Sequence, residues 1–542
     1  MSSLSVKALV NRRAFEKGWK NLKGNGSIDL YKKYEVGARV MSEVAKKLEE
    51  FAEYLKKINH YTTAGNLMYW DMTTGMPEAM AETRAETLSF FQTEVHNLNV
   101  SPKIEEFIKF FESHMDEFDY TYKRMTKQLK KDYEKQKRYP EEFIREFSLA
   151  ASRGEVAWEK AKNASDFEIF KPALEKIVEL TKKSIEYKGY KDNKYDALLD
   201  DYEAGLTVEK LDKVFGELRD GIVEILNKIK STGKEIDDSF FHKEFPKSEQ
   251  ESLCLKLLDI MGFDFKRGRM DETEHPYTID MTNKDVRITN HYYENDFTSA
   301  LFSAIHEGGH AIYEQDIPDS LEGTGLNVAA SMAIHESQSR FYENIIGKSR
   351  EFSNYLYNES VKQFKGQFEG VSKEQFYKAL NKVTPSLIRT EADELTYSLH
   401  IIIRYEIEKL LINDLIEVKD LPRVWNEKYK EYLGVEPTND KEGVLQDVHW
   451  SDGSFGYFPS YALGNLYGAQ MLHKMTKDVP GIYEEIGKGN LQPVHKWLKE
   501  NVHEYANLYD PSNLIKKITG EELQAKYFLQ YLDNKYKAIY NY

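Results

Sequence analysis

The stretch SAIHEGGHA at residues 303–311 places His306 and His310 four residues apart with Glu307 between them. On a helix this spacing puts both imidazoles on one face, where they can bind one metal ion, and the glutamate can act as a general base toward water. Gly308 and Gly309 each cost about 1 kcal/mol relative to alanine in a helix. We therefore expect a helix stabilised by tertiary packing or by the metal, with the glycines allowing another backbone to approach closely.

The flanking residues predict where this helix begins and ends. Asn295 or Asp296 can cap its start, and Pro318 ends it. An apolar face is formed by Phe297, Leu301, Ala304 and Gly308. A separate polar line, at steps of three and four, is formed by Ser299, Ser303, His306, His310 and Tyr313.

A third ligand is available in the helical segment 327–347, where Glu336 lies 26 residues after His310. Glutamate-type zinc peptidases use a glutamate on the next helix at about this distance. The neighbouring His335 points about 100° away around the helix, so we do not expect it to bind the same ion. Two histidines and one carboxylate leave a fourth position for water, which is typical of a catalytic rather than a structural zinc.

Most of the remaining chain has helical periodicity. The pattern predicts helices over 40–58, 141–162, 171–187 and 385–412, the last with Thr384 as cap and Pro385 as its first residue. Residues 277–293 instead alternate apolar and polar side chains around Asn283 and Lys284, which predicts a short antiparallel hairpin. An exposed strand edge there can bind a peptide through main-chain hydrogen bonds.

The composition limits the classes of function. The chain has 542 residues, 41% of them hydrophobic and 30% charged, without a linker-like stretch, so we expect one large body. The net charge of -15 argues against nucleic-acid and anionic-membrane partners. Cys254 alone cannot form an intramolecular disulfide and fits a reducing compartment. No apolar run approaches the ~20 residues that span a membrane.

The N-terminal stretch is rich in basic residues. Residues 1–26 carry six basic side chains and one acidic one, Glu16. Such a start is compatible both with a basic first helix and with an organelle-targeting segment. We expect residues 1–35 to be a basic extension, residues 36–542 to be a single domain, and the protein to be cytoplasmic.

Five motifs together resemble one known family. DVRIT (285–289), HEGGH (306–310), HESQ (335–338), IRTEAD (388–393) and GVLQDVHW (443–450) are similar in order and type to the motifs of the carboxypeptidase Taq family of metallopeptidases. The resemblance implies a mainly helical, all-α fold, with a neurolysin-like saddle, a long active-site groove and one small antiparallel β element near the zinc helix. It also implies a homodimer and a broad-specificity carboxypeptidase acting on peptides, with one zinc per chain that cobalt can replace.

This chain departs from the family pattern at three places. HPYT at 275–278 replaces the usual His-Pro-Phe, YEAG at 202–205 replaces Tyr-Glu-Pro-Gly, and Gly308 stands where a larger residue is common. The first of these bears on how a substrate subsite packs rather than on catalysis.

The chemistry of a carboxypeptidase suggests further roles. A free C-terminal carboxylate suits the planar fork of arginine, and Arg287, Arg340 and Arg389 lie inside the motifs. Arg389 could instead belong to a buried ion network with Asp393, Tyr397, His400 and Arg404. By analogy with related zinc peptidases, Tyr457 and Tyr461 are candidate oxyanion donors. Motif membership adds His275 and His449 as substrate-binding candidates, and His335, Gln338, Asp393, Gln446 and Asp447 as supporting residues.

Two other functions remain open. A zinc oligopeptidase could cut internal bonds in the same groove, and a helical peptide-binding protein could keep the fold without the chemistry. The intact set of His306, Glu307, His310 and Glu336 argues against the second.

Overall fold

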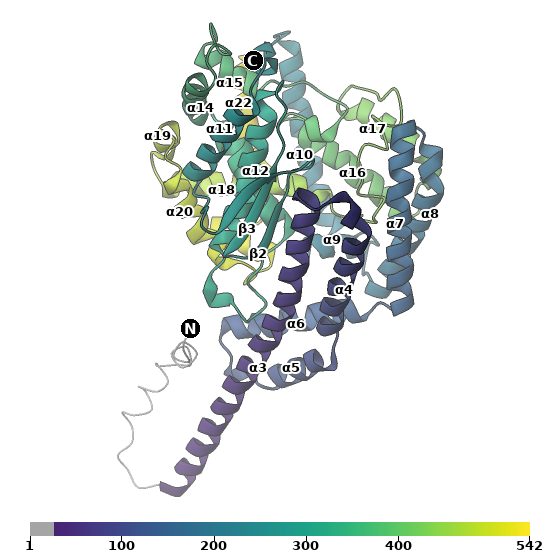
Figure 1. The fold of residues 1–542 in the computed structure, drawn as a ribbon, viewed down its shortest axis with the longest axis vertical. Coiled ribbons are helices and arrows are strands. Elements are labelled where there is room, and N and C mark those ends of the chain that lie inside the picture. Colours follow the sequence, from purple (N-terminus) through teal and green to yellow (C-terminus); the bar gives the residue numbers. More distant parts are fainter. Residues whose placement is uncertain (1–26) are drawn as a thin grey trace.

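The computed structural model describes residues 27–542, and helices dominate it, with one small sheet near the centre (Figure 1). The predicted mainly helical fold class is confirmed. The first helices are α3 (Ser27–Thr74), α4 (Ala81–Asn99), α5 (Pro102–Ser113), α6 (Tyr120–Lys137), α7 (Glu141–Ala164), α8 (Phe167–Lys188), α9 (Asp196–Tyr202), α10 (Val208–Ser231) and α11 (Lys247–Met261). Within the described residues, no helix is both long enough and apolar enough to cross a membrane.

The second half of the chain carries the remaining elements. They are α12 (Phe297–Asp316), α13 (Met332–Arg340), the π-helical turn η5 (Phe341–Ile346), α14 (Arg350–Gln363), α15 (Lys373–Leu380), α16 (Tyr397–Ile412), α17 (Leu421–Tyr432), α18 (Pro459–Asp478), α19 (Ile482–Gly487), α20 (Gln492–Asn501), α21 (Pro511–Thr519) and α22 (Lys526–Tyr540). Helix α12 lies at the centre, packed on α11, α13, β2 and β3 (Figure 1).

The sheet contains the predicted hairpin and one further strand. Strands β2 (Thr278–Thr282) and β3 (Asp285–Asn290) pair antiparallel around Asn283 and Lys284, as predicted. Strand β1 (Gly268–Glu272) pairs parallel with β3 and makes β3 the central strand. Its sequence, GRMDE, lacks the alternation of apolar and polar residues that identified the hairpin, so the pattern did not reveal it.

The outer edge of β2 is partly covered by α3. Thr63 Oγ1 donates to the Met281 carbonyl at 3.2 Å, and Asn66 Nδ2 donates to the Asp280 carbonyl at 2.8 Å. At these two residues the strand edge is therefore occupied by helix side chains, which already bond the carbonyls that a docked peptide would use there.

Two of the hydrophobic clusters contain most of the buried apolar side chains in the described residues. The larger extends from α7 to α22 and includes α12 and the core strand β3. A smaller one joins α3, α5 and α6 through Phe51, Phe107 and Phe111, whose rings meet edge to face or stacked. The N-terminal helices therefore have a core of their own beside the main body.

The predicted boundary between residues 35 and 36 lies inside α3, which begins at Ser27. The basic stretch 1–26 lies outside the described residues, so the division into an extension and a single domain stays a prediction.

The helix predicted over 385–412 is wrong in its first part. Helix α16 begins at Tyr397, and Arg389 lies in a short 3-10 turn, Arg389–Glu391. Tertiary contacts override local helix preference here, because the Arg389 main-chain N–H donates to Gln446 Oε1 at 3.0 Å. Asp393, rather than Thr384, satisfies the backbone before α16 by accepting from the N–H groups of Thr384 and Thr396.

Candidate metal centre and active site

Helix α12 carries the two histidines and is buried along most of its surface. Asp296 caps its start, accepting from the N–H groups of Thr298 and Ser299 at 2.7 and 3.1 Å, as one of the two predicted caps. The half-exposed line on the helix passes through His306 and His310 and continues to Glu314. Tyr313, predicted on this line, is instead fully buried.

The predicted ligands come together on this face. One donor atom each from His306, His310 and Glu336 lies within 4.8 Å of the others. Glu336 Oε2 is 3.4 Å from His310 Nε2 and 3.8 Å from His306 Nε2, so one carboxylate oxygen faces both imidazoles. Two imidazole nitrogens and one carboxylate oxygen are a donor set that suits a divalent metal such as zinc.

The other ring nitrogen of each histidine also has a partner. His306 Nδ1 is 2.7 Å from Glu343 Oε2. His310 Nδ1 contacts His335 Nδ1, and His335 Nε2 lies 2.8 Å from Glu314 Oε1. His335 thus contacts the far side of the His310 ring and is not part of the ligand cluster, in line with its predicted orientation. Such contacts orient the rings of metal-binding histidines.

Burial and neighbouring charges set the protonation of the cluster. Burial, reinforced by His335, lowers the pKa of His310 to about 3, so its ring is neutral. For Glu336 burial opposes ionisation, but the Arg340 guanidinium and the two histidines outweigh it and hold its pKa below the ordinary range. The result is a neutral imidazole and a carboxylate facing each other, the forms in which these groups bind a metal.

Glu307 lies on the neighbouring face of α12, between the ligand histidines and β2. Thr278 Oγ1, on β2, donates to its Oε2 at 2.6 Å. The side chain is 8% exposed, and burial raises its pKa above the ordinary value. The hydroxyl of Thr278 therefore fixes one carboxylate oxygen of a buried glutamate beside the cluster.

Glycines let the supporting helices approach the ligands. A Cβ on Gly309 would lie 2.6 Å from the Gln338 carbonyl oxygen, and one on Gly464 would lie 2.7 Å from Glu336 Cγ. Helix α12 therefore packs directly on the backbone of α13, and α18 packs directly on Glu336. The first contact confirms the expected close approach of another backbone.

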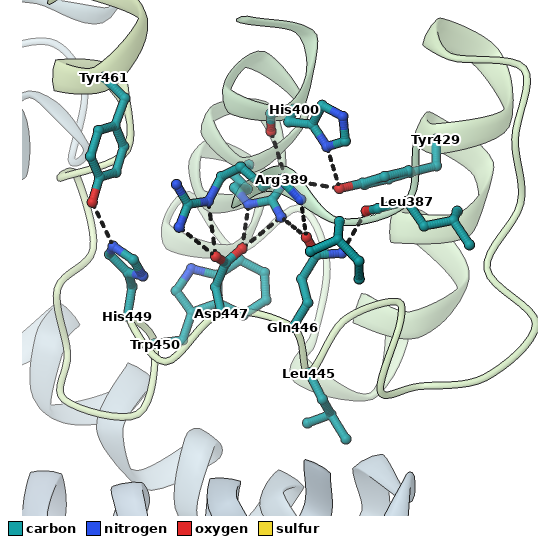
Figure 2. A network of polar contacts seen from close by, with 12 residues as sticks. Leu387, Arg389, His400, Tyr429, Leu445, Gln446, Asp447, His449, Trp450 and Tyr461 are labelled. Atoms are coloured by element: carbon teal, nitrogen blue, oxygen red, sulfur yellow. Dashed lines mark hydrogen bonds and ion pairs between the residues drawn. The ribbon is translucent and has the colours of Figure 1, made fainter. Parts of the chain in front are cut away.

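Arg389 belongs to a buried ion network (Figure 2). Its Nε and Nη2 atoms both lie 2.9 Å from Asp447 Oδ1, while Arg404 approaches Asp447 Oδ2 at 2.6 Å. Gln446 Oε1 accepts from Arg404 Nη2 at 2.7 Å, and Tyr429 stands between Arg404 and His400. The two guanidiniums hold the pKa of Asp447 below its usual range, although burial opposes this.

The network contains more positive than negative charge. Asp447 faces both Arg389 and Arg404. Burial lowers the pKa of His400 well below its ordinary value and that of His449 to about 4, so both rings are neutral. Among these five residues one positive charge is therefore unmatched.

Arg287 is paired separately on the sheet. Its Nε and Nη2 atoms form a bidentate pair with Asp285 at 2.8 Å each, and its guanidinium carbon lies 5.6 Å from the centre of a Trp70 ring. It points opposite to the buried Val286 and Ile288, as predicted. Unlike Arg389, it has a carboxylate of its own.

Of the two predicted tyrosines, Tyr461 lies in the first turn of α18 and Tyr457 lies just before the helix, beside the network. Tyr461 OH is 3.2 Å from His449 Nε2, and the ring of Tyr461 lies 5.1 Å from the Arg389 guanidinium carbon (Figure 2). The rings of Tyr457 and Tyr461 are edge to face at 5.1 Å. Burial raises the pKa of Tyr457 to about 12, and the charge of Glu336 acts in the same direction, so its hydroxyl keeps its proton.

Three other predicted residues lie away from the cluster. His275 is exposed in the loop between β1 and β2 and shares no hydrogen bond with the ligands in the described part of the chain. Gln338 accepts from His503 at 2.9 Å on the far side of α13. Asp393 caps the backbone before α16. For Gln338 and Asp393, the structure therefore shows only local structural contacts.

A cleft of about 470 Å³ opens near the end of α12 that lies beyond the histidines. Its walls come from α3, α6, the β2–β3 turn and the segment after α12. Glu314 lines it and also contacts His335, so the cleft is linked to the ligand cluster through these two side chains.

Several residues around the cluster were not predicted as parts of it, among them Glu343, Thr278 and Gly464. A signal existed for Glu343, because Glu336, Arg340 and Glu343 are spaced by four and three residues and share a helix face. Thr278 and Gly464 carry no such signal, since they meet the site only through packing of β2 and α18.

Comparison with known proteins finds relatives over most of the chain. The family model described as carboxypeptidase Taq (M32) metallopeptidase matches residues 50–536. Carboxypeptidase 1 of Bacillus subtilis is 45% identical over 492 residues, covering 91% of this chain and 98% of that protein. Thermostable carboxypeptidase 1 of Thermus thermophilus is 36% identical, again covering 91% and 98%. The crystal structure of an M32 carboxypeptidase from Deinococcus radiodurans superposes with a TM-score of 0.89 at 33% identity, covering 92% of this chain and 100% of that one.

The fold and the site together define a metallopeptidase. The chain belongs to the carboxypeptidase Taq (M32) family of metallopeptidases, so the predicted resemblance is confirmed.

Proposed function

We propose that this protein is a zinc-dependent carboxypeptidase that releases C-terminal amino acids from peptides with broad specificity. The observation that carries the proposal is the convergence of His306, His310 and Glu336 beside the buried carboxyl of Glu307. Membership of the family and the names of its relatives supply the reaction class.

His306 Nε2, His310 Nε2 and Glu336 Oε2, the three atoms that face one another, would hold the metal. When bound there, a divalent zinc supplies Lewis-acid chemistry, polarising a carbonyl and making water more acidic. One ion per chain fits the one such cluster found within residues 27–542, and cobalt is an expected substitute.

Glu307 acts as the general base and then as the general acid. Its raised pKa makes it a better proton acceptor than an ordinary glutamate. Thr278 holds one of its oxygens, so the other is free to take a proton from the attacking water and to deliver it to the leaving amine.

Arg389 is the proposed partner of the substrate's terminal carboxylate. The buried network around it has an unmatched positive charge, whereas Arg287 is already neutralised by Asp285. A carboxylate beside Arg389 would therefore complete a buried charge balance. Tyr457 and Tyr461, which keep their protons, are the proposed donors to the developing oxyanion.

His449 supports Tyr461 through its Nε2 atom, and Gln446 and Asp447 hold Arg389 in place. His275 remains a substrate-binding proposal that rests on its motif alone. We further propose a homodimer located in the cytoplasm, with neither nucleic acid nor membrane as a partner.

A time course of peptide digestion tests the reaction class. The same peptide is supplied with a free and with an amidated C-terminus, and the products are followed by mass spectrometry. We expect a ladder that shortens only from the free C-terminus and stops when a chelator is added. Equal cleavage of both peptides at internal bonds would identify an oligopeptidase, and absence of bound metal with no cleavage would identify a non-catalytic binding protein.

A further inference from the structure

Arg340 occupies the side of Glu336 that faces away from the two histidines. Its Nε atom lies 2.7 Å from Glu336 Oε1, whereas His306 and His310 approach Oε2. The two oxygens of the ligand carboxylate are thus divided between a guanidinium and the metal position. A carboxylate with one oxygen engaged in this way presents the other alone.

The same guanidinium reaches a second carboxylate. Arg340 Nη1 is 3.3 Å from Glu343 Oε2, the atom that also lies 2.7 Å from His306 Nδ1. Arg340 therefore connects one metal ligand directly and a second, His306, through Glu343. The spacing of Glu336, Arg340 and Glu343 along α13 and η5 puts all three on one face.

The guanidinium is itself held in place. Its carbon lies 4.1 Å from the centre of the Tyr397 ring, and the side chain is only 13% exposed. The guanidinium is planar and stacked, and its N–H donors point in fixed directions, so it can bond two carboxylates at once. A lysine ammonium, at the end of a flexible stem, does not reproduce this arrangement.

Arg340 also sets the charge of the cluster. Glu336 and Glu343 bring two carboxylates close to His306. The arginine balances one of them, leaving a single negative charge among these three residues for a divalent cation. Without it, repulsion between the two carboxylates would favour their rotation away from each other.

We propose that Arg340 is a positioning residue of the metal centre, which fixes Glu336 as a one-oxygen ligand and, through Glu343, fixes the ring of His306. The inference rests on the proposed function only in that a divalent metal binds at His306, His310 and Glu336. It assigns Arg340 to the metal and removes it from the candidates for the substrate carboxylate.

The test compares Arg340→Lys with the wild-type protein. The dissociation constant for Zn²⁺ is measured by competition with a chromophoric chelator, and the visible absorption spectrum is measured on Co²⁺-loaded protein. We expect Arg340→Lys to weaken Zn²⁺ binding by about 10- to 100-fold, the usual effect of removing an outer contact of a metal ligand. The Co²⁺ spectrum should change as well, because the guanidinium would no longer hold Glu336 Oε1 and leave Oε2 alone to face the metal.

Arg350→Lys is a matched control. Arg350 also pairs with a glutamate, Glu374, and lies 4.5 Å from the centre of a tyrosine ring, Tyr377, but it touches no metal ligand. Glu343→Gln is a second, nearly isosteric variant, and it should weaken Zn²⁺ binding too by removing the shared acceptor of Arg340 and His306. Arg350→Lys should leave both the affinity and the spectrum unchanged.

The outcomes distinguish a failure of the positioning role of Arg340 from a failure of the proposed function. Zn²⁺ affinities of Arg340→Lys and Glu343→Gln within twofold of wild type, with unchanged Co²⁺ spectra, would overturn the positioning role. A lower melting temperature of metal-free Arg340→Lys with unchanged affinity and spectrum would show a merely structural role and overturn it equally. If the wild-type protein itself bound no divalent metal, the proposed function would fail first.

Discussion

Gly309 in α12 packs against the main chain of Gln338 in α13, where an added Cβ would lie only 2.6 Å from the carbonyl oxygen. The same added Cβ would lie 2.7 Å from Cα of Ser339, the next residue of α13. This contact sets the distance between the helix that carries both histidines and the helix that carries Glu336. The glycine that weakens the helix locally is required by the geometry of the metal site.

The two glycines of HEGGH should therefore respond differently to alanine. A Cβ on Gly309 meets backbone, which cannot move aside, so Gly309→Ala should destabilise the protein by about 1–3 kcal/mol and weaken metal binding. A Cβ on Gly308 meets the flexible ends of Leu258 and Met261, and alanine favours the helix by about 1 kcal/mol. Thermal unfolding and zinc titration of both variants check this, and equal effects would contradict it.

Glu307→Gln should retain zinc and lose turnover. The amide keeps the size of the side chain but cannot accept a proton from water, so kcat should fall by at least about a hundredfold. Metal analysis of the purified variant controls for the ligand site. Activity within tenfold of wild type would remove Glu307 as the general base.

Arg389→Lys should raise KM for peptides with a free C-terminus more than it changes metal content. The lysine keeps the charge but loses the planar fork that pairs with a carboxylate. Arg287→Lys is the comparison variant. It alters the ion pair with Asp285 on the sheet, and its KM for the same peptides should change less. If Arg389→Lys lowered the melting temperature but left KM unchanged, the network would be structural and Arg389 would not bind substrate.

The stability of the protein should fall as the pH rises from about 5 to 8, partly because of Glu203. This carboxyl is fully enclosed next to Tyr467, whose hydroxyl donates to it at 2.6 Å, and burial raises its pKa to about 7. The unfolded value is about 4.3, so between these values the folded state binds the extra proton, and its stabilising effect is lost as the pH passes through 7. The difference corresponds to about 4 kcal/mol.

Glu203→Gln should make the melting temperature less dependent on pH over this range, because the amide does not ionise. Glu427→Gln, at a side chain that is 61% exposed, should leave the dependence as in wild type. Differential scanning calorimetry at several pH values measures both. Parallel pH profiles for Glu203→Gln and wild type would contradict the assignment to Glu203.

Local sequence patterns were enough to predict much of the fold and of the candidate site. The spacing of His306 and His310, the cap at Asp296 and the turn at Asn283 and Lys284 follow from rules that act within a few residues. Each was predictable because helix and strand periods place side chains without reference to the rest of the molecule. Strand β1 and the start of α16 were missed because partners distant in sequence, β3 and Gln446, decide them.

The sequence by itself determined the ligand types, their spacing and the family, because these are written in contiguous motifs. Only the tertiary structure decided which arginine faces which carboxylate. Arg340 could be assigned to Glu336 and Glu343, Arg287 to Asp285, and Arg389 to a network shared with Arg404 around Asp447. An arginine's role depends on which charges packing brings within a few ångströms, and Gln446 and Asp447, which bond Arg389, lie more than 50 residues away along the chain.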